Sequence, residues 1–189
     1  MKIDIILAGV GGQGIVSIAA TIGLAALKSN LNLKQSEVHG MSQRGGEVQS
    51  HMRISDGEIA SDLVSQGKAD LIISVEPMES LRYLPWLSNL GWLITNTTPF
   101  VNIPNYPPID KVLDEIKKLK NHILIDADAI AKELNSPKSA NMVILGAASK
   151  HLSIPFEKLE EAIRSMFGRK GEEIVNINLK ALKAGRDAS

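Results

Sequence analysis

The hydrophobic positions of the chain fall into short apolar runs separated by stretches with helical spacing. The runs Lys2–Ala8, Leu71–Val75 and Ile123–Ile125 are almost wholly apolar and rich in β-branched residues. Parallel strands that are covered on both faces have this composition. Leu33–Val38 and Trp92–Thr95 predict two further strands. The pattern therefore predicts a sheet buried on both faces.

Helical spacing dominates between these runs and throughout the last third of the chain. Residues 99–108 contain four prolines and predict an irregular connection, and Gly168 and Gly171 are stop signals between the last two helices. The predicted helices are 15–29, one beginning near Pro77, Ile109–Lys118, Asp126–Leu134, Asn141–His151, Pro155–Phe167 and Glu172–Lys183.

One segment has the alternating pattern of an antiparallel strand. Val48–Ile54 alternates apolar and polar residues, Asp56 and Gly57 form a turn signal, and the alternation continues through residues 59–63. We therefore expect a β-hairpin around Asp56 and Gly57.

The order of these elements predicts an α/β fold. It is Rossmann-like, with a mostly parallel sheet, helices on both faces, one β-hairpin and a helical C-terminal section. A length of 189 residues suits a single domain, and we expect residues 1–189 to form one.

Composition narrows the chemistry that the chain can perform. Basic and acidic residues number 21 each, so no net charge favours nucleic acid as a partner. Cysteine is absent, which excludes disulfides, thiolate zinc sites and cysteine-ligated iron–sulfur clusters. Any redox metal must therefore belong to a partner.

A membrane role is rejected although Ile5–Leu27 is uncharged and about as long as a membrane span. Glycines crowd its first half, and the flank carries only Lys2, with Asp4 close behind. A secretory signal would begin with a basic segment. We expect a cytoplasmic protein.

A glycine-rich turn lies between the first strand and the first helix. Gly9-Val10-Gly11-Gly12-Gln13-Gly14 has the spacing G-x-G-x-x-G. Glycines allow positive φ, which we expect at Gly11, and let a ligand approach the backbone, while the helix start favours an anion. The spacing also fits a turn that only packs the helix onto the strand. Glu37 lies roughly where a dinucleotide fold needs an acid, so a dinucleotide-dependent oxidoreductase stays open as an alternative.

A second glycine-rich segment follows the second strand. His39-Gly40-Met41-Ser42-Gln43-Arg44-Gly45-Gly46 combines three glycines with an imidazole, a hydroxyl, an amide and a guanidinium. Because it leaves a parallel strand, it should lie beside the first turn at the carboxyl edge of the sheet, where open α/β sheets bind ligands. A solvated turn is the plainer alternative. We expect the two segments to meet and to form one surface that a partner completes.

With these motifs the sequence resembles a known family. Gly9–Ile15, Glu37–Gly46 and Ser50–Ile54 resemble the small subunit of indolepyruvate:ferredoxin oxidoreductases, and are similar to the gamma domain of the pyruvate and 2-oxoglutarate enzymes. Ser42-Gln43 is closer to the indolepyruvate branch, since pyruvate-type relatives tend to carry Pro-Glu there. The resemblance continues nearly to the C-terminus, through Ala69-Asp70, Glu76-Pro77, Asn96-Thr97, Asn141, Leu145-Gly146 and Asn176 to Leu179.

The resemblance implies a subunit of an oxidoreductase that is not active alone. In that reaction an aryl 2-oxoacid is decarboxylated, its acyl group passes to coenzyme A, and ferredoxin is reduced. A large partner subunit would hold thiamine diphosphate and the iron–sulfur clusters, and ferredoxin would be an indirect partner. This chain would bind no cofactor alone and would contribute binding and orientation. A non-enzymatic assembly subunit remains an alternative.

The sequence assigns no catalytic residue and no metal ligand. The candidates for a ligand or partner site are Gly9, Gly11, Gly12, Gln13, Gly14, His39, Ser42, Gln43, Arg44, Gly45 and Gly46. His122 and His151 lack a partner at ligand spacing and are interpreted as structural, as is His51. Asp126 and Asp128 resemble a paired acid site, but Asp126 is more simply a helix cap.

Overall fold

A computed structural model describes residues 1–39 and 45–189, apart from the side chain of His39. Within these residues six strands form one sheet in the order β2-β3-β1-β4-β5-β6. The strands are β1 (Lys2–Val10), β2 (Asn32–His39), β3 (Glu47–Ser55), β4 (Ala69–Ser74), β5 (Leu87–Asn96) and β6 (His122–Ile125). Ile5, Ile6 and Leu7 of β1 are wholly buried, as expected of a central strand covered on both faces.

The sheet is mostly parallel, and β3 is the strand that runs against the others. It pairs antiparallel with β1 on one side and with β2 on the other, while β1, β4, β5 and β6 pair parallel in turn. The hairpin is therefore β2–β3, connected by residues 40–46.

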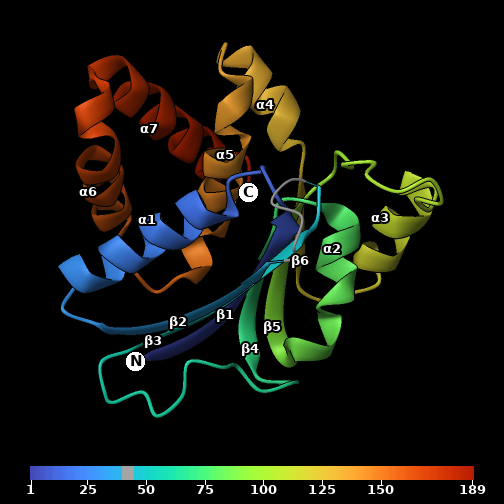
Figure 1. Ribbon diagram of the computed structural model, residues 1–189, viewed down its shortest axis with the longest axis horizontal. Coiled ribbons are helices and arrows are strands. Elements are labelled where there is room, and N and C mark those ends of the chain that lie inside the picture. The colour runs from blue at the N-terminus through green and yellow to red at the C-terminus, as the bar shows by residue number, and fades with distance from the viewer. Residues whose placement is uncertain (40–44) are drawn as a thin grey trace.

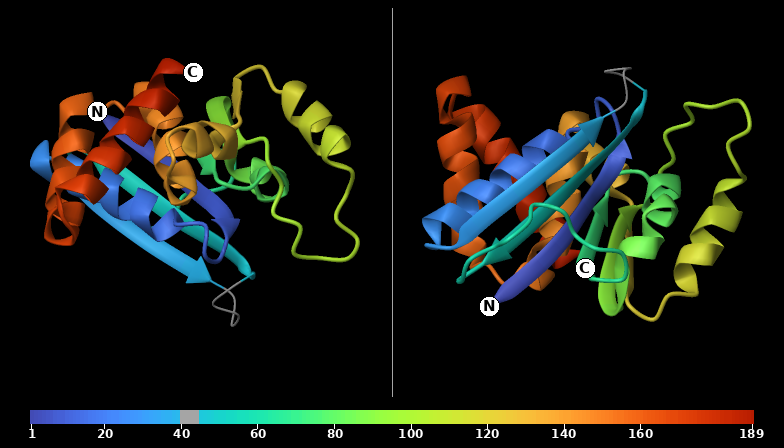
Figure 2. Two further views of the ribbon diagram at one scale, coloured as in Figure 1. Left: turned by 90° about the horizontal axis from the view of Figure 1, so that it is seen from above. Right: turned by 60° about the horizontal axis from the view of Figure 1, so that its bottom comes forward.

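The predicted partner of residues 48–54 was wrong, since residues 59–63 form no strand. Both edges of β3 are already occupied, so no edge is free for a further strand. Residues 56–68 instead cross the sheet face, as the right view of Figure 2 shows. The Arg53 guanidinium donates there to the carbonyl oxygens of Ser61 and Leu63 at 3.1 and 3.3 Å.

Helices cover both faces of the sheet (Figure 1). A large apolar cluster joins one face to α1, α4, α5, α6 and α7, and a smaller cluster joins the other face to α2 and α3. The predicted α/β, Rossmann-like class is confirmed. The helices are α1 (Ile15–Lys28), α2 (Pro77–Arg82), α3 (Ile109–Lys117), α4 (Ala127–Glu133), α5 (Ala140–Ala148), α6 (Phe156–Phe167) and α7 (Glu172–Asp187).

The last helix runs past its predicted end at Lys183 and includes Gly185. A Cβ on Gly185 would collide with the carbonyl group of Val143 in α5, and one on Gly146 would collide with the carbonyl of Leu182. These glycines let α5 and α7 approach each other closely, so Gly185 serves helix packing and does not end the helix.

The uncharged stretch Ile5–Leu27 is divided between β1 and α1. Across residues 1–39 and 45–189, no helix is both long and apolar enough to cross a membrane.

Candidate functional site

The first glycine turn joins β1 to α1 at the carboxyl edge of the sheet. Gly14 precedes the first residue of α1 and has the left-handed conformation, with φ +85°. The Gln13 side chain closes the turn: its Oε1 accepts from the Val10 N–H at 2.8 Å, and its Nε2 donates to the Val75 carbonyl at 3.5 Å. Gln13 therefore ties the turn to the end of β4.

The two glycine segments meet, as predicted. The Gly11 N–H donates to the Gly46 carbonyl at 2.8 Å, and the Gly45 N–H donates to the Gly11 carbonyl at 3.3 Å. These bonds extend the pairing of β1 with β3 beyond Val10 and Glu47.

Part of the predicted site lies outside the described residues. This holds for Ser42, Gln43, Arg44 and the side chain of His39. Their roles stay predictions.

The expected positive φ at Gly11 was wrong. Positive φ values occur in this turn at Gly9, Gly12 and Gly14. Gly11 instead continues the strand pairing with Gly45 and Gly46. Gly9 is required by packing, because a Cβ there would collide with the Val75 side chain.

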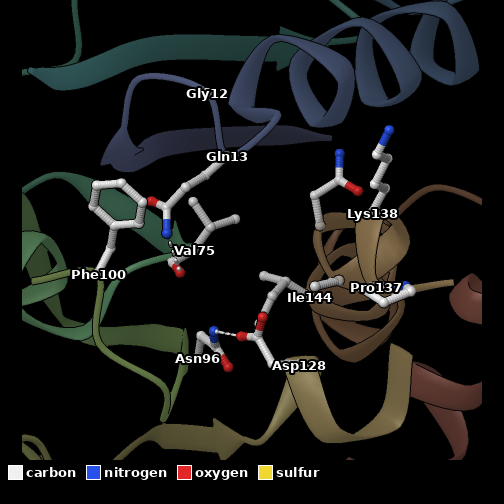
Figure 3. A pocket seen from close by; sticks show the side chains of 11 residues that line it. Gly12, Gln13, Val75, Asn96, Phe100, Asp128, Pro137, Lys138 and Ile144 are labelled. Carbon is white, nitrogen blue, oxygen red and sulfur yellow. Dashed lines mark hydrogen bonds between the residues drawn. The ribbon is translucent and has the colours of Figure 1, made fainter. Parts of the chain in front are cut away.

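A pocket of about 210 Å³ opens beside the first turn (Figure 3). Its walls come from the glycine turn, the ends of β4 and β5, the segment after β5, α4, the short 3-10 turn Pro137–Ser139 and the start of α5. The lining residues are Gly12, Gln13, Val75, Asn96, Phe100, Asp128, Pro137, Lys138, Ala140, Asn141 and Ile144. Ligands bind at this edge in open α/β sheets.

One wall of the pocket is acidic and tightly hydrogen-bonded. The buried Asn96 donates from Nδ2 to the Asp128 carboxylate at 2.6 Å and accepts at Oδ1 from the Ala127 N–H at 3.0 Å. Asp126 accepts from the Ala129 N–H at 2.9 Å, which confirms its interpretation as a helix cap. The two aspartates therefore have different roles: Asp126 caps α4, and Asp128 lines the pocket.

The opposite wall suits an anion. Lys138 is the cation among the described lining residues, and Figure 3 shows it across the pocket from Phe100. The Ser17 N–H already donates to the Gly14 carbonyl at 3.0 Å, whereas the N–H groups of Ile15 and Val16 precede any helical acceptor, and the helix dipole favours negative charge there. Asn141 fixes this helix start, since its Nδ2 donates to the Gly14 carbonyl at 3.2 Å.

Sequence reasoning did not assign Asn96, Phe100, Lys138 or Asn141 to a site. A local signal exists for Asn96, which ends a buried strand at the carboxyl edge. Lys138 has no such signal, because only the packing of α5 against the sheet brings it to this edge.

The three discounted histidines have structural contacts. His51 Nδ1 accepts from the Val64 N–H at 3.0 Å, and its ring meets Trp86 edge-on, so burial lowers the His51 pKa. His122 Nδ1 bonds the Leu119 carbonyl at 2.8 Å, and the His151 ring packs on Trp92. In the part of the chain that the structure describes, no three His, Asp or Glu side chains group as metal ligands.

The strand order disfavours the dinucleotide alternative. Glu37 lies in β2, and β3 separates β2 from β1. An acid for the ribose should lie on the strand next to the glycine turn, but Glu37 is two strand spacings away, or about 10 Å.

Comparison with known proteins identifies relatives over nearly the whole chain. The family model "Pyruvate ferredoxin/flavodoxin oxidoreductase" matches residues 4–188. Indolepyruvate oxidoreductase subunit IorB of Archaeoglobus fulgidus is 37% identical, over 98% of this chain and 94% of that protein. The subunit of the same name from Methanothermobacter thermautotrophicus is 37% identical, over 100% of this chain and 98% of that protein. The pyruvate/ketoisovalerate oxidoreductases common subunit gamma of Thermococcus kodakarensis is 29% identical over 90% of each chain.

Solved structures share the fold. Pyruvate oxidoreductase subunit PORC of Thermotoga maritima superposes with a TM-score of 0.76 at 22% identity, covering 99% of this chain and 96% of that one. The 2-oxoglutarate:ferredoxin oxidoreductase of Magnetococcus marinus, solved with 2-oxoglutarate, coenzyme A and succinyl-CoA bound, gives a TM-score of 0.78 at 22% identity. This chain is covered to 99% in that match but spans only 31% of the Magnetococcus chain.

Proposed function

This chain belongs to the pyruvate ferredoxin/flavodoxin oxidoreductase family, and we propose that it is the small subunit of an enzyme that oxidises indolepyruvate or a similar aryl 2-oxoacid. The observation that carries the proposal is 37% identity to two IorB subunits over nearly the full length of both chains, against 29% to a gamma subunit of the pyruvate type.

The proposed reaction divides its chemistry between two subunits. The 2-oxoacid would lose its carboxylate as CO₂, its acyl group would form a thioester with coenzyme A, whose thiol gives up its proton, and the two released electrons would reduce ferredoxin. Iron–sulfur clusters would supply the path for these electrons. Thiamine diphosphate, which the large subunit would bind, supplies the carbanion chemistry. This chain has no cysteine to ligate a cluster, so the clusters also belong to the large subunit.

The contribution proposed for this chain is a binding site for one phosphate group of coenzyme A. The start of α1 offers N–H donors, and Lys138 offers a cation. Among the described residues, none other than the chain neighbours of Gly12 has an atom within 4 Å of where a Gly12 Cβ would be. A pocket of about 210 Å³ accommodates a phosphate and its neighbouring group. It is smaller than the roughly 300–1,000 Å³ that enclose a whole ligand, so the remainder of coenzyme A would lie against the large subunit.

The large subunit should dock beside this pocket. Phe100, Val101 and Ile103 are exposed by 42, 67 and 37% on the segment that borders the site. Exposed apolar residues next to an incomplete site favour a protein interface there. Its occupant in this proposal is the thiamine diphosphate subunit, because that subunit carries the reacting centre.

Reconstitution tests the function. The large subunit is assayed for substrate-dependent ferredoxin reduction with and without this chain, using indolepyruvate, pyruvate and 2-oxoglutarate in parallel. We expect activity only with both subunits and the highest kcat/KM with indolepyruvate. Full activity of the large subunit alone would reject a functional role, and a preference for 2-oxoglutarate would reject the aryl substrate.

A coenzyme A titration separates binding from assembly. Lys138→Ala should raise the KM for coenzyme A without changing the affinity between the subunits. Lys150→Ala is the matched control, because Lys150 contacts the C-terminal residue Ser189. If Lys138→Ala leaves the KM for coenzyme A unchanged while the chain is still required, the assembly-subunit alternative is favoured.

A further inference from the structure

A proline-rich strap, residues 97–108, lines the pocket at Phe100 and bonds Gly45 through Asn102. It follows β5 and contains no helix or strand. Four prolines limit its conformations, but side-chain hydrogen bonds decide where it lies. Thr97 and Thr98 at its start bond to Asn96, Ile125 and Asp126. Beyond them, the side-chain hydrogen bonds of the described residues tie the strap to Glu76 and to Gly45.

Glu76 is a buried carboxylate with only 1% of its surface exposed. Its Oε1 accepts from the Phe100 N–H at 3.3 Å and from the Tyr106 hydroxyl, and its Oε2 accepts from the Glu79 N–H at 2.8 Å. A buried carboxylate is costly unless such donors surround it. The strap therefore supplies hydrogen-bond donors to the Glu76 carboxylate, and these bonds in turn fix the position of the strap.

The strap reaches the glycine segments through Asn102. Asn102 Nδ2 donates to the Gly45 carbonyl at 2.8 Å, and the Gly45 N–H donates to Gly11. On the other side, Glu76 directly follows Val75, whose carbonyl accepts from Gln13.

These contacts close a ring around one side of the pocket. It runs from Glu76 through the strap to Gly45, across to Gly11, along the turn to Gln13, and back to Val75. Each contact in the ring restrains the next residue, so the loss of one contact should increase the mobility of the glycine turn.

We propose that Glu76 is a positioning residue of this site, which fixes the glycine turn through the strap and Asn102 without touching the ligand. The proposal rests on the proposed function for its ligand, the phosphate group of coenzyme A, but the ring itself can be tested without a ligand. If the strap were only a stabilised loop, disrupting its anchors would lower the melting temperature without loosening the turn.

Amide hydrogen exchange in the isolated chain tests the ring. Tyr106→Phe removes one donor to Glu76, and Asn102→Asp keeps the side-chain shape but cannot donate to Gly45. Each should speed exchange of the Gly11 and Gly45 amides by about 2- to 10-fold, the factor expected from one lost hydrogen bond. Asn121→Ala is the control, because it removes an amide bond to the Leu90 carbonyl at the opposite edge of the sheet.

Steady-state kinetics of the reconstituted enzyme test the consequence. Tyr106→Phe and Asn102→Asp should raise the KM for coenzyme A by a similar factor and leave kcat within about twofold. Asn121→Ala should leave both constants unchanged. Unchanged exchange at Gly11 and Gly45 would overturn the ring, even if stability fell. Faster exchange with an unchanged KM would support the ring but reject Glu76 as a positioning residue for the coenzyme A site.

Discussion

Replacing Gly14 by alanine should lower the free energy of unfolding by about 2–4 kcal/mol, because two costs coincide there. The first is backbone strain: Gly14 has φ +85°, a conformation that costs a non-glycine residue about 1–3 kcal/mol. The second is steric. A Cβ at Gly14 would collide with the Asn141 amide and displace the group that donates to the Gly14 carbonyl. Losing that hydrogen bond costs about 1 kcal/mol.

Thermal unfolding measures the sum of the strain cost and the steric cost. Substitutions at two other glycines separate the two costs. For a chain of this size, 1 kcal/mol corresponds to about 2–4 °C in Tm. Gly12→Ala introduces backbone strain, since φ is +102°. Its Cβ would meet no described residue within 4 Å apart from its chain neighbours, so the loss of stability should be about 1 kcal/mol smaller than at Gly14. Gly168→Ala has neither cost, with φ −54°, and should be neutral or slightly stabilising.

A double-mutant cycle tests the role assigned to Asn141. Asn141→Ala removes the colliding amide, so adding it to Gly14→Ala should cost about 1 kcal/mol less than additivity predicts. If Gly12→Ala and Gly14→Ala destabilise equally and the cycle is additive, the contact between α5 and the glycine turn does not contribute to stability.

Three further predictions concern the partner, the second glycine segment and pH. Val101→Asp should weaken binding of the large subunit by about tenfold or more, measured by titration calorimetry. Leu90, which is 80% exposed at the opposite edge of the sheet, provides the control, and Leu90→Asp should leave binding unchanged. Equal effects of the two substitutions would contradict the proposed docking side. Arg44→Ala should reduce turnover with coenzyme A by about 2 kcal/mol of binding or transition-state energy and leave Tm unchanged; normal turnover would dismiss its role. Burial lowers the pKa of His51, so the unfolded chain takes up the proton first and stability should fall as pH drops below 6.5. His51→Gln should flatten this slope in denaturant titrations at several pH values, and an unchanged slope would show that His51 does not cause it.

Much of the architecture follows from local pattern. A β-branched run ending in glycines and followed by helical spacing defines β1, the turn and α1 without reference to the rest of the chain. The meeting of the two glycine segments was also predictable, because both follow strands of the same direction and therefore emerge at one edge of the sheet.

The errors have a common physical cause. Alternation in residues 48–54 reports that a strand has two different faces, but it does not report which strands occupy its edges. The insertion of β3 between β1 and β2 decides that, and it also moves Glu37 away from the glycine turn. The predicted end of the last helix at Lys183 was too early, and the role of Gly185 inside this helix depends on the approach of α5.

Local pattern and composition suffice to predict the α/β class, the glycine turn at the start of α1 and the absence of any thiolate ligand, because each depends on neighbouring residues or on composition alone. The pocket and the ring around it arise from tertiary packing. Asn96, Lys138 and Gly12 come together from three separated segments, and Glu76 reaches the glycine turn through the strap. Such contacts between distant segments depend on how the sheet is ordered and how the helices pack, which no local pattern encodes.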